Sequence, residues 1–287
     1  MVNVILSLVG SNGDEIVFDN NGDFLLTEGL TGIGIPDTQV RFADSASDGG
    51  VWRFTKRGIR EIDMPLMILG SSNTALEANL RRLSNLLQDR RGATKLRASY
   101  PNGEVWELQD GHYVSGATTT LEANSNGSWT RWAITMQFAN PFWIRERSES
   151  FSLGTGGAQR SLIPTLAEME ITGSQVIGDI TVENVGDCDA YPVWKVRGPV
   201  DSVTVTSQDG LSFSYDAIIP LGSEITIDTA NGTVVDQNGV NKYANLGASP
   251  KLFTLPAGTS EVFIEAVGSD QDTLVSLYYQ PRKEVVH

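Results

Sequence analysis

Residue types that carry catalysis or hold metals are few in this chain and far apart. The two histidines, His112 and His287, are too few for a histidine-rich metal cluster. The single cysteine, Cys188, lies between Asp187 and Asp189, whose negative charge disfavours a reactive thiolate. The sequence has no Gly-x-Ser-x-Gly elbow, phosphate-binding loop, Cys-x-x-Cys or His-Glu-x-x-His motif. We therefore expect no enzyme, no metal site and no cofactor.

Carboxylates are numerous, and they are unevenly distributed. The formal net charge is −14, with 35 Asp and Glu against 21 Lys and Arg. Most of the excess lies in residues 148–287, which nucleic acid and anionic membranes should repel. A hydrolase pair among these carboxylates stays open, although no pair stands out. Asp228 and the Asn231-Gly232 step have the spacing of a hairpin and lack the ligand order of a calcium loop.

A basic cluster next to Trp52 and Phe54 is the first candidate surface. Its four members are Arg53, Lys56, Arg57 and Arg60. One interpretation is a surface that meets acidic groups on a neighbouring subunit or lines a passage for DNA. The alternative is a solvated strand face with an ordinary scatter of charge.

The second candidate is a short seam at which the composition of the chain changes. It consists of Asn140, Pro141, Phe142 and Trp143. Proline ends the preceding strand and fixes the direction of the chain, and the two aromatic residues can anchor the next segment. We expect a first module at 1–147 and a second at 148–287, with a linker at 148–168 and the seam as the joint between the modules.

The first module is expected to be a β-rich α+β fold, like a split barrel, with one helix. Leucines at 76, 80, 83 and 87 repeat with helical spacing, Thr74 and Glu77 fit a capping box, and Arg90 and Arg91 suit the last turn. The glycine alternation of residues 30–35 permits close backbone approach. The predicted strands are 2–8, 15–18, 51–55, 60–69, 94–100, 105–108, 113–122 and 128–138, with a turn at 124–127 between the last two.

The second module shows strands and turns at roughly ten-residue spacing and no helix pattern, which is typical of a β-sandwich. The predicted strands are 177–183, 191–196, 200–206, 211–215, 224–228, 234–236, 249–255, 261–267 and 273–279. Two aromatic residues, Trp194 and Tyr243, are candidates for contact with a glycan or a partner. The alternative is that aromatic residues at alternating strand positions fill the core.

Three blocks of residues, taken in order, resemble the siphophage distal tail protein family. The first is the seam, an Asx-Pro-aromatic segment. The second leads from Asn184-Val185-Gly186 into the Tyr191-Pro192-Val193-Trp194 run and the Gly198-Pro199 step. The third is a succession of strand, hairpin, Pro-Gly turn and final strand: 225–228, 238–241, 253–258 and 277–282. The likeness covers the whole length in organisation and is most specific in 138–287.

This resemblance implies a ring-forming component of a long non-contractile phage tail tip. Family members form hexameric rings through their N-terminal modules, between the tail tube and the tail-tip hub. Their galectin-like C-terminal sandwiches project outward and can hold receptor-binding proteins. We accordingly expect a homohexamer in the virion, assembled in the host cytoplasm, without a specific nucleic acid and without membrane insertion. The alternative is a carbohydrate-binding or adhesion protein with no role in tail assembly.

The N-terminal residues carry no basic segment of the kind that opens a secretory signal, and no apolar run reaches the length of a membrane span. We therefore expect neither a secreted precursor nor a membrane protein.

Overall fold

The computed structural model describes residues 4–88, 92–117, 128–146, 148–154 and 175–286. The chain forms two compact units, each with its own apolar core. Unit 1 comprises Met1–Glu146 and Lys283–His287, and unit 2 comprises Arg147–Arg282. The chain therefore returns to unit 1 at Lys283, whereas the sequence interpretation assigned this segment to the second module.

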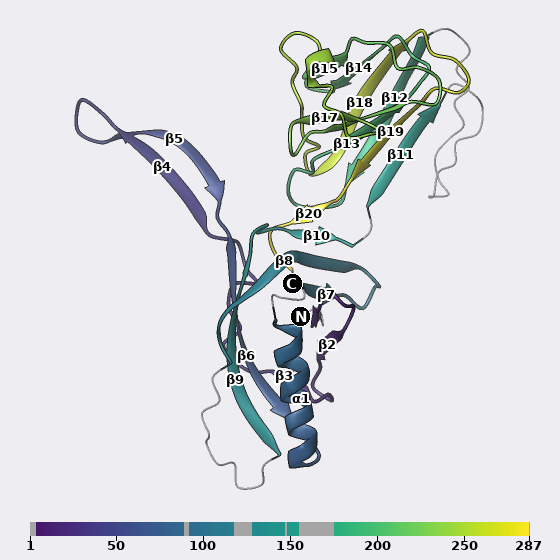
Figure 1. Cartoon of the computed structure of the whole chain (residues 1–287). Helices are drawn as coiled ribbons and strands as arrows, with labels where there is room; N and C mark the ends of the chain where they lie inside the picture. The colour runs from purple at the N-terminus through teal and green to yellow at the C-terminus, as the bar shows by residue number, and fades with distance from the viewer. Residues whose placement is uncertain (1–3, 89–91, 118–127, 147, 155–174, 287) are drawn as a thin grey trace. The chain divides into compact units, whose positions relative to one another are not determined.

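Unit 1 is built on an antiparallel sheet that curves around its core (Figure 1). Its described strands are β1 (Ile5–Val9), β2 (Glu15–Phe18), β3 (Phe24–Leu26), β6 (Arg60–Leu69), β7 (Thr94–Ser99), β8 (Val105–Gly116), β9 (Trp129–Phe138), β10 (Trp143–Arg145) and β20 (Arg282–Lys283). Along the sheet the order is β2-β1-β7-β8-β9-β6-β3, and β10 pairs with β8 and β20. Side chains alternate between core and outside, so β6 buries Ile62, Met64, Leu66 and Ile68.

A single helix is described in unit 1, α1 (Asn73–Leu86). The predicted leucine stripe is confirmed, because Leu83 is buried and Leu76 and Leu80 pack against the core. The predicted capping box is wrong. The hydroxyl of Ser72 accepts the N–H of Ala75 at 3.2 Å, so the cap is Ser72, two residues before the expected cap Thr74. The two arginines expected in the last turn lie outside the described residues.

Glycine is required where backbones approach closely in unit 1. A Cβ at Gly32 would lie 1.9 Å from the carbonyl oxygen of Glu61, which confirms the close approach expected in residues 30–35. In β8, a Cβ at Gly111 would lie 2.4 Å from the ring of Phe138. Both contacts let neighbouring segments of the curved sheet come together.

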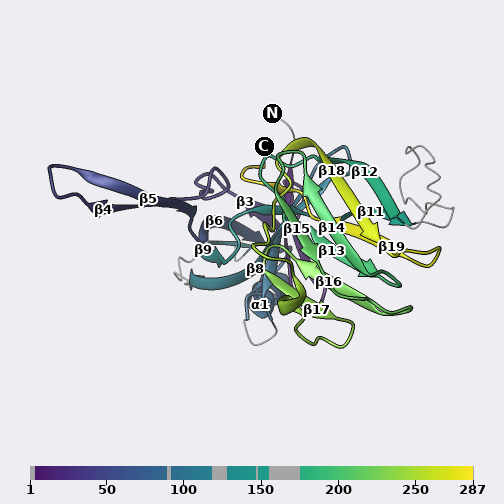
Figure 2. The same cartoon turned by 90° about the horizontal axis from the view of Figure 1, so that it is seen from above.

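Unit 2 is a sandwich of two described sheets, whose strands are visible in Figure 2. One sheet has the order β11-β19-β13-β16-β17, and the other has the order β12-β18-β14-β15. Their bounds are β11 (Glu149–Gly154), β12 (Gln175–Asn184), β13 (Val193–Arg197), β14 (Ser202–Ser207), β15 (Ser212–Tyr215), β16 (Glu224–Asp228), β17 (Thr233–Asp236), β18 (Gly258–Val267) and β19 (Leu274–Tyr279), with a short 3-10 helix, η2 (Tyr243–Asn245). The predicted fold class, mainly β with a β-rich α+β module and a sandwich, is confirmed.

Four sequence expectations need correction or lie in part outside the described residues. Residues 149–154 were placed in a linker but form β11, which pairs with β19. The strand expected at 249–255 contributes only a bridge between Leu255 and Ala190. The linker from 155 on, the end of the strand expected at 113–122 and the turn at 124–127 fall outside the described residues. Among described helices, none has the length and apolar character needed to cross a bilayer.

Candidate functional site

The main candidate surface is a hairpin of unit 1 formed by β4 (Thr38–Asp44) and β5 (Gly50–Arg57). In the described part of the chain these strands pair only with each other, and both views show them extending away from the curved sheet (Figures 1 and 2). Nearly every residue of the hairpin is exposed, including large apolar ones: Val40, Phe42, Val51, Trp52 and Phe54. Exposed apolar groups gathered in this way are typical of an interaction surface.

The register of the hairpin places apolar side chains on both of its faces. Phe42 is paired directly with Trp52, and the two are 62% and 59% exposed. Arg41 is paired with Phe54, and a bulge follows between Arg41 and Phe42. Arg41 and Phe42 are neighbours on β4 and therefore point to opposite faces, and each shares its face with its partner on β5. Because the bulge inserts one extra residue between these two pairs, Phe54 lies on the face opposite to Trp52. No described layer of the chain covers either face.

The four members of the basic cluster separate in the structure. Arg53 and Lys56 are exposed on β5, and neither has an ion-pair partner among the described residues. Arg57, at the end of β5, donates from Nε to the Glu284 carboxylate at 2.7 Å. Arg60 was expected on the same surface but is only 2% exposed. It starts β6, whose alternation directs this side chain inward.

Arg60 instead holds together three separate segments of unit 1. Its guanidinium donates to the backbone carbonyls of Gly32, Gly34, Pro141 and Glu284, at 2.6 to 2.8 Å. Burial lowers the pKa of Arg60 to about 10, against the opposing attraction of the Glu284 carboxylate. The partners include both the seam and the returning C-terminal segment, so one side chain fixes the places where the chain leaves and re-enters unit 1.

The seam lies against unit 1. The side-chain oxygen of Asn140 accepts the N–H of Phe142 at 3.1 Å, which forms a local turn around Pro141. Trp143 begins β10 and is fully buried in the core of unit 1, and Phe142 is half-buried. The structure therefore brings the seam and Arg60 together, and Glu284 links Arg60 to Arg57 at the end of the hairpin.

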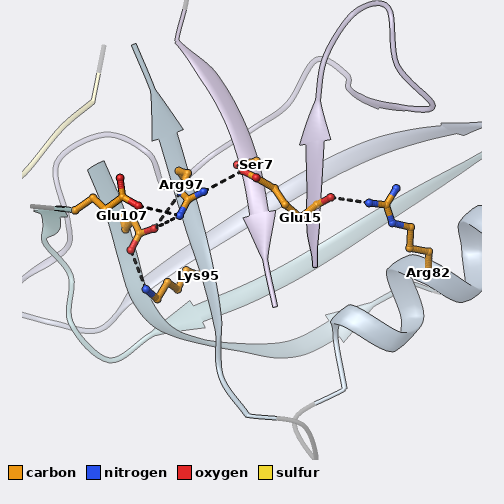
Figure 3. Close-up of polar contacts among 7 residues, drawn as sticks. Ser7, Glu15, Arg82, Lys95, Arg97 and Glu107 are labelled. Carbon is orange, nitrogen blue, oxygen red and sulfur yellow. Dashed lines mark hydrogen bonds and ion pairs between the residues drawn. The ribbon is translucent and has the colours of Figure 1, made fainter. Parts of the chain in front are cut away.

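A network of charges that sequence analysis did not single out crosses the outer face of β1, β2, β7 and β8 (Figure 3). Glu107 is 1% exposed and accepts from Arg97 at 2.8 Å and from Lys95 at 3.0 Å. Arg97 also contacts Glu15 at 3.4 Å and Glu146 at 3.3 Å. Burial opposes the charge on Arg97, yet hydrogen bonding and attraction to Glu107, followed by Glu15 and Glu146, together raise its pKa.

The network fastens strands to one another and to the helix. Ser7 on β1 donates to Glu15 at 2.6 Å, and Arg82 of α1 donates to the backbone carbonyl of Glu15 at 2.7 Å (Figure 3). Alternation along a strand could have indicated a polar outer face, but it gives no sign that Glu107 is covered. Because the charged groups of this network bind one another, the network indicates a structural role.

In unit 2 the two aromatic candidates have different environments. Trp194 is fully buried between the sheets, with Phe213 and Phe253 at ring distances of 6.2 and 6.5 Å. It therefore cannot stack on a glycan, and the core interpretation of this residue is correct. Tyr243 is 46% exposed on η2. A cavity of about 170 Å³ in this unit is lined in part by Asp189, Glu261 and Phe253, and neither candidate lines it.

No cluster of three or more metal-ligating side chains occurs among the residues that the structure describes. Cys188 donates its thiol to the carboxylate of Asp187 at 3.0 Å, beside a bridge to Arg282. His112 lies within β8.

Comparison with solved structures finds a phage protein of similar fold. The crystal structure of SPP1 Dit (gp 19.1), described as a paradigm of the hub adsorption apparatus in phages that infect Gram-positive bacteria, matches with a TM-score of 0.62 and 12% identity, covering 96% of this chain and 98% of that one. At this identity the likeness establishes the fold alone. A chain of the phage P2 baseplate in its activated conformation with calcium matches over 100% of both chains, with a TM-score of 0.49 and 12% identity. No family model and no curated protein matches the chain.

Proposed function

We propose that this protein is a structural component of the tail tip of a phage with a long, non-contractile tail. Copies of the chain form a ring, most simply a hexamer, that links the tail tube to tail-tip hub or receptor-binding proteins. The observation that carries the proposal is the likeness to SPP1 Dit, which extends over both units and 96% of the chain. A likeness of this extent covers the succession of two folded units along the chain and not a single common module.

The charge distribution supports a ring built from the first module. Residues 1–147 carry 14 Lys and Arg against 17 Asp and Glu, a net of −3, whereas residues 148–287 carry 7 against 18, a net of −11. Six nearly neutral modules can lie close together, while strongly acidic ones repel one another and favour positions farther apart. The exposed apolar hairpin of unit 1 supplies contact surface for such a ring.

The seam takes the role of joint in this proposal. Trp143 fixes the end of unit 1 in its core, and Arg60 binds both Pro141 and Glu284. The first module then forms the ring and the sandwich carries other baseplate proteins. The proposal places the protein in the virion after assembly in the host cytoplasm, and it assigns no catalytic step and no cofactor. The alternative function, carbohydrate binding, is weakened because Trp194 is buried in the core. Of the two candidate aromatic residues, only Tyr243 is exposed.

The mass of the purified chain in solution tests the ring. A hexamer has a mass of about 187 kDa, six times the 31.1 kDa of one chain. We expect mass photometry to find this species at micromolar concentration and negative-stain images to show rings with a central opening. A tail tube protein added to the sample should cap these rings. A monomer at every concentration, with tube and hub proteins present, would contradict the proposal.

A further inference from the structure

The cavity of unit 2 lies where two neighbouring strands of the sandwich meet their ends. Strand β14 ends there at Ser207, and β18, which pairs with it, begins at Gly258. The walls come from these two strands, from the turn after β14 and from the segment before β18. Its volume of about 170 Å³ leaves room for a group of several heavy atoms, since one water in the liquid takes about 30 Å³.

Part of the wall is apolar. Phe253 and Leu255 are 4% and 1% exposed, and Val262 is fully buried on the inward face of β18. Leu211, just after the turn that follows β14, also lines the cavity and is exposed. Surface of this kind gains free energy when a hydrocarbon chain packs against it.

The wall also contains a buried hydroxyl that lacks a partner. Ser260 shares the inward face of β18, is 5% exposed, and its Oγ has no hydrogen-bond partner among the described residues. Other hydroxyl groups of the wall are bonded: Ser207 accepts the N–H of Leu211 at 3.1 Å, and Thr254 donates to Asp189 at 2.9 Å. An unpaired buried hydroxyl costs free energy, so Ser260 favours a ligand that bonds to it.

The charge of the wall indicates the class of that ligand. Asp189, Asp209 and Glu261 line the cavity, and no lysine or arginine lines it. None of the three forms an ion pair with a described residue. Residues 148–287 add a net charge of −11, so the cavity repels phosphates and carboxylates and attracts cations.

Among cations, a primary ammonium on an alkyl chain fits best. A metal ion would make no use of the apolar wall, and no cluster of three metal-ligating side chains is found in the part of the chain that the structure describes. A guanidinium prefers paired acceptors in one plane, whereas the acceptors here come from separate segments. A lysine side chain combines an apolar stem with a compact charge that has three donors.

We propose that this cavity of unit 2 binds the side chain of a lysine on another protein. The stem packs against Phe253 and Leu211, and the ammonium donates to Ser260 Oγ and to the carboxylates of Asp189 and Asp209. The source of the lysine rests on the proposed function, in which the sandwich carries other baseplate proteins. The cavity itself lies within one unit and requires no ring.

A ligand-observed titration of the full chain tests the site. The probe is Nα-acetyl-lysine methylamide, and saturation-transfer NMR detects its binding to a monomer and to a ring alike. For a single side chain we expect a Kd of about 1–10 mM. Nα-acetyl-norleucine methylamide lacks only the ammonium group and should bind about tenfold or more weakly. Cadaverine, a free diamine, should not bind more tightly than the lysine probe.

A matched pair of serine variants locates the binding. Ser260→Ala should weaken binding of the lysine probe about fivefold or more, while its thermal unfolding stays at or above that of the wild type, because the hydroxyl it removes is unpaired. Ser269→Ala is the control. This serine is also buried in unit 2, but its hydroxyl donates to the carbonyl of Ala266 at 3.4 Å. The control should bind the probe like the wild type.

A matched pair of aspartate variants tests the charge. Asp209→Asn should weaken binding of the lysine probe about threefold, the effect of one partly exposed ion pair. Asp179→Asn makes the same change in net charge at an exposed position of β12 that does not line the cavity, and it should leave binding unchanged. Equal weakening by both variants would mean that only the overall charge of the unit attracts the probe.

The outcomes separate this inference from the proposed function. Equal binding of the lysine and norleucine probes, or unchanged binding by Ser260→Ala, would overturn the lysine site and leave the ring untouched. Tighter binding of cadaverine would assign the cavity to free amines and overturn the protein partner. A chain that stays monomeric in mass photometry yet binds the lysine probe through Ser260 would contradict the proposed ring and support the site.

Discussion

Trp52 and Trp194 stand in similar stretches of sequence and in opposite surroundings. Each lies on a strand in which large apolar residues recur among polar ones, yet Trp52 is 59% exposed and Trp194 is fully buried. The difference is the second layer: unit 2 provides a facing sheet, whereas the described residues provide none for the β4–β5 hairpin. Alternation therefore shows that a strand has an apolar face, but not whether its own chain covers that face.

The same contrast holds for charge. Arg53 and Arg60 belong to one basic cluster, but Arg53 is exposed and Arg60 is buried among carbonyl groups. A buried cation fixes the fold, and an exposed one is available for contact. Stability measurements on the dilute, unassembled chain should therefore separate the two classes.

The largest difference is expected between the two tryptophans. Trp194→Ala removes a fully buried side chain and should lower the free energy of unfolding of unit 2 by about 3–5 kcal/mol. Trp52→Ala should change the free energy of unfolding of the dilute chain by only about 0.5 kcal/mol or less. Urea denaturation followed by circular dichroism measures both. Equal losses would mean that the hairpin is covered within a single chain.

The two arginines should differ in the same direction. Arg60→Met leaves several buried carbonyl groups without a donor, and we expect a loss of about 3 kcal/mol in the unfolding of unit 1. Arg53→Met is the matched control and should be nearly neutral in the dilute chain, while it weakens assembly. An Arg60→Met variant as stable as the wild type would show that water replaces the guanidinium at little cost.

The charge network gives a third pair of variants with a smaller effect. Glu107→Gln weakens charged hydrogen bonds in a buried site and should cost about 2 kcal/mol. Glu146, whose side chain is 47% exposed, contacts the same Arg97, and Glu146→Gln should cost about 0.5 kcal/mol or less. Thermal unfolding at low and high salt compares them. Similar losses for both would contradict the assigned burial of Glu107.

The smallest effect is expected at a hairpin turn of unit 2. The N–H groups of Val240 and Asn238, together with Lys242, lower the pKa of Asp236. A carboxyl whose pKa is lowered by folding stabilises the protein above its unfolded pKa, and this contribution is lost as pH falls. Asp236→Asn should therefore melt slightly below the wild type at neutral pH. The difference should shrink as pH falls below the ordinary aspartate pKa of about 4, and it should be lost once pH has fallen through the lowered pKa of the folded state. A difference that persists unchanged in acid would assign it to lost turn geometry.

Local patterns were sufficient to predict much of the fold. The 3.6-residue leucine spacing predicted the helix, and strand alternation predicted β6 and most strands of the sandwich. The sequence prediction placed the helix cap at Thr74 because both Ser72 and Thr74 suit an N-cap position. The turn at Gly70 favours Ser72. A Cβ at Gly70 would lie 2.4 Å from the backbone nitrogen of Leu76, so the chain enters the helix through a tight bend.

The candidate surfaces were less predictable, because they depend on contacts distant in sequence. Arg60 is buried because Gly32, Pro141 and Glu284 surround it, and no local pattern predicts such a set. The return of the chain to unit 1 at Lys283 likewise has no signal in the residues around it.

Hydrogen exchange compares the hairpin with the sandwich most directly. Amides of residues 38–44 and 50–57 should exchange about tenfold or more slowly in the assembled protein than in the dilute chain, because in the proposed ring the hairpin is covered by another copy. Amides of β13 and β18 in the core of unit 2 should exchange equally in both states. Rings whose hairpin amides exchange as fast as those of the monomer would contradict the claim that this hairpin is the contact between copies.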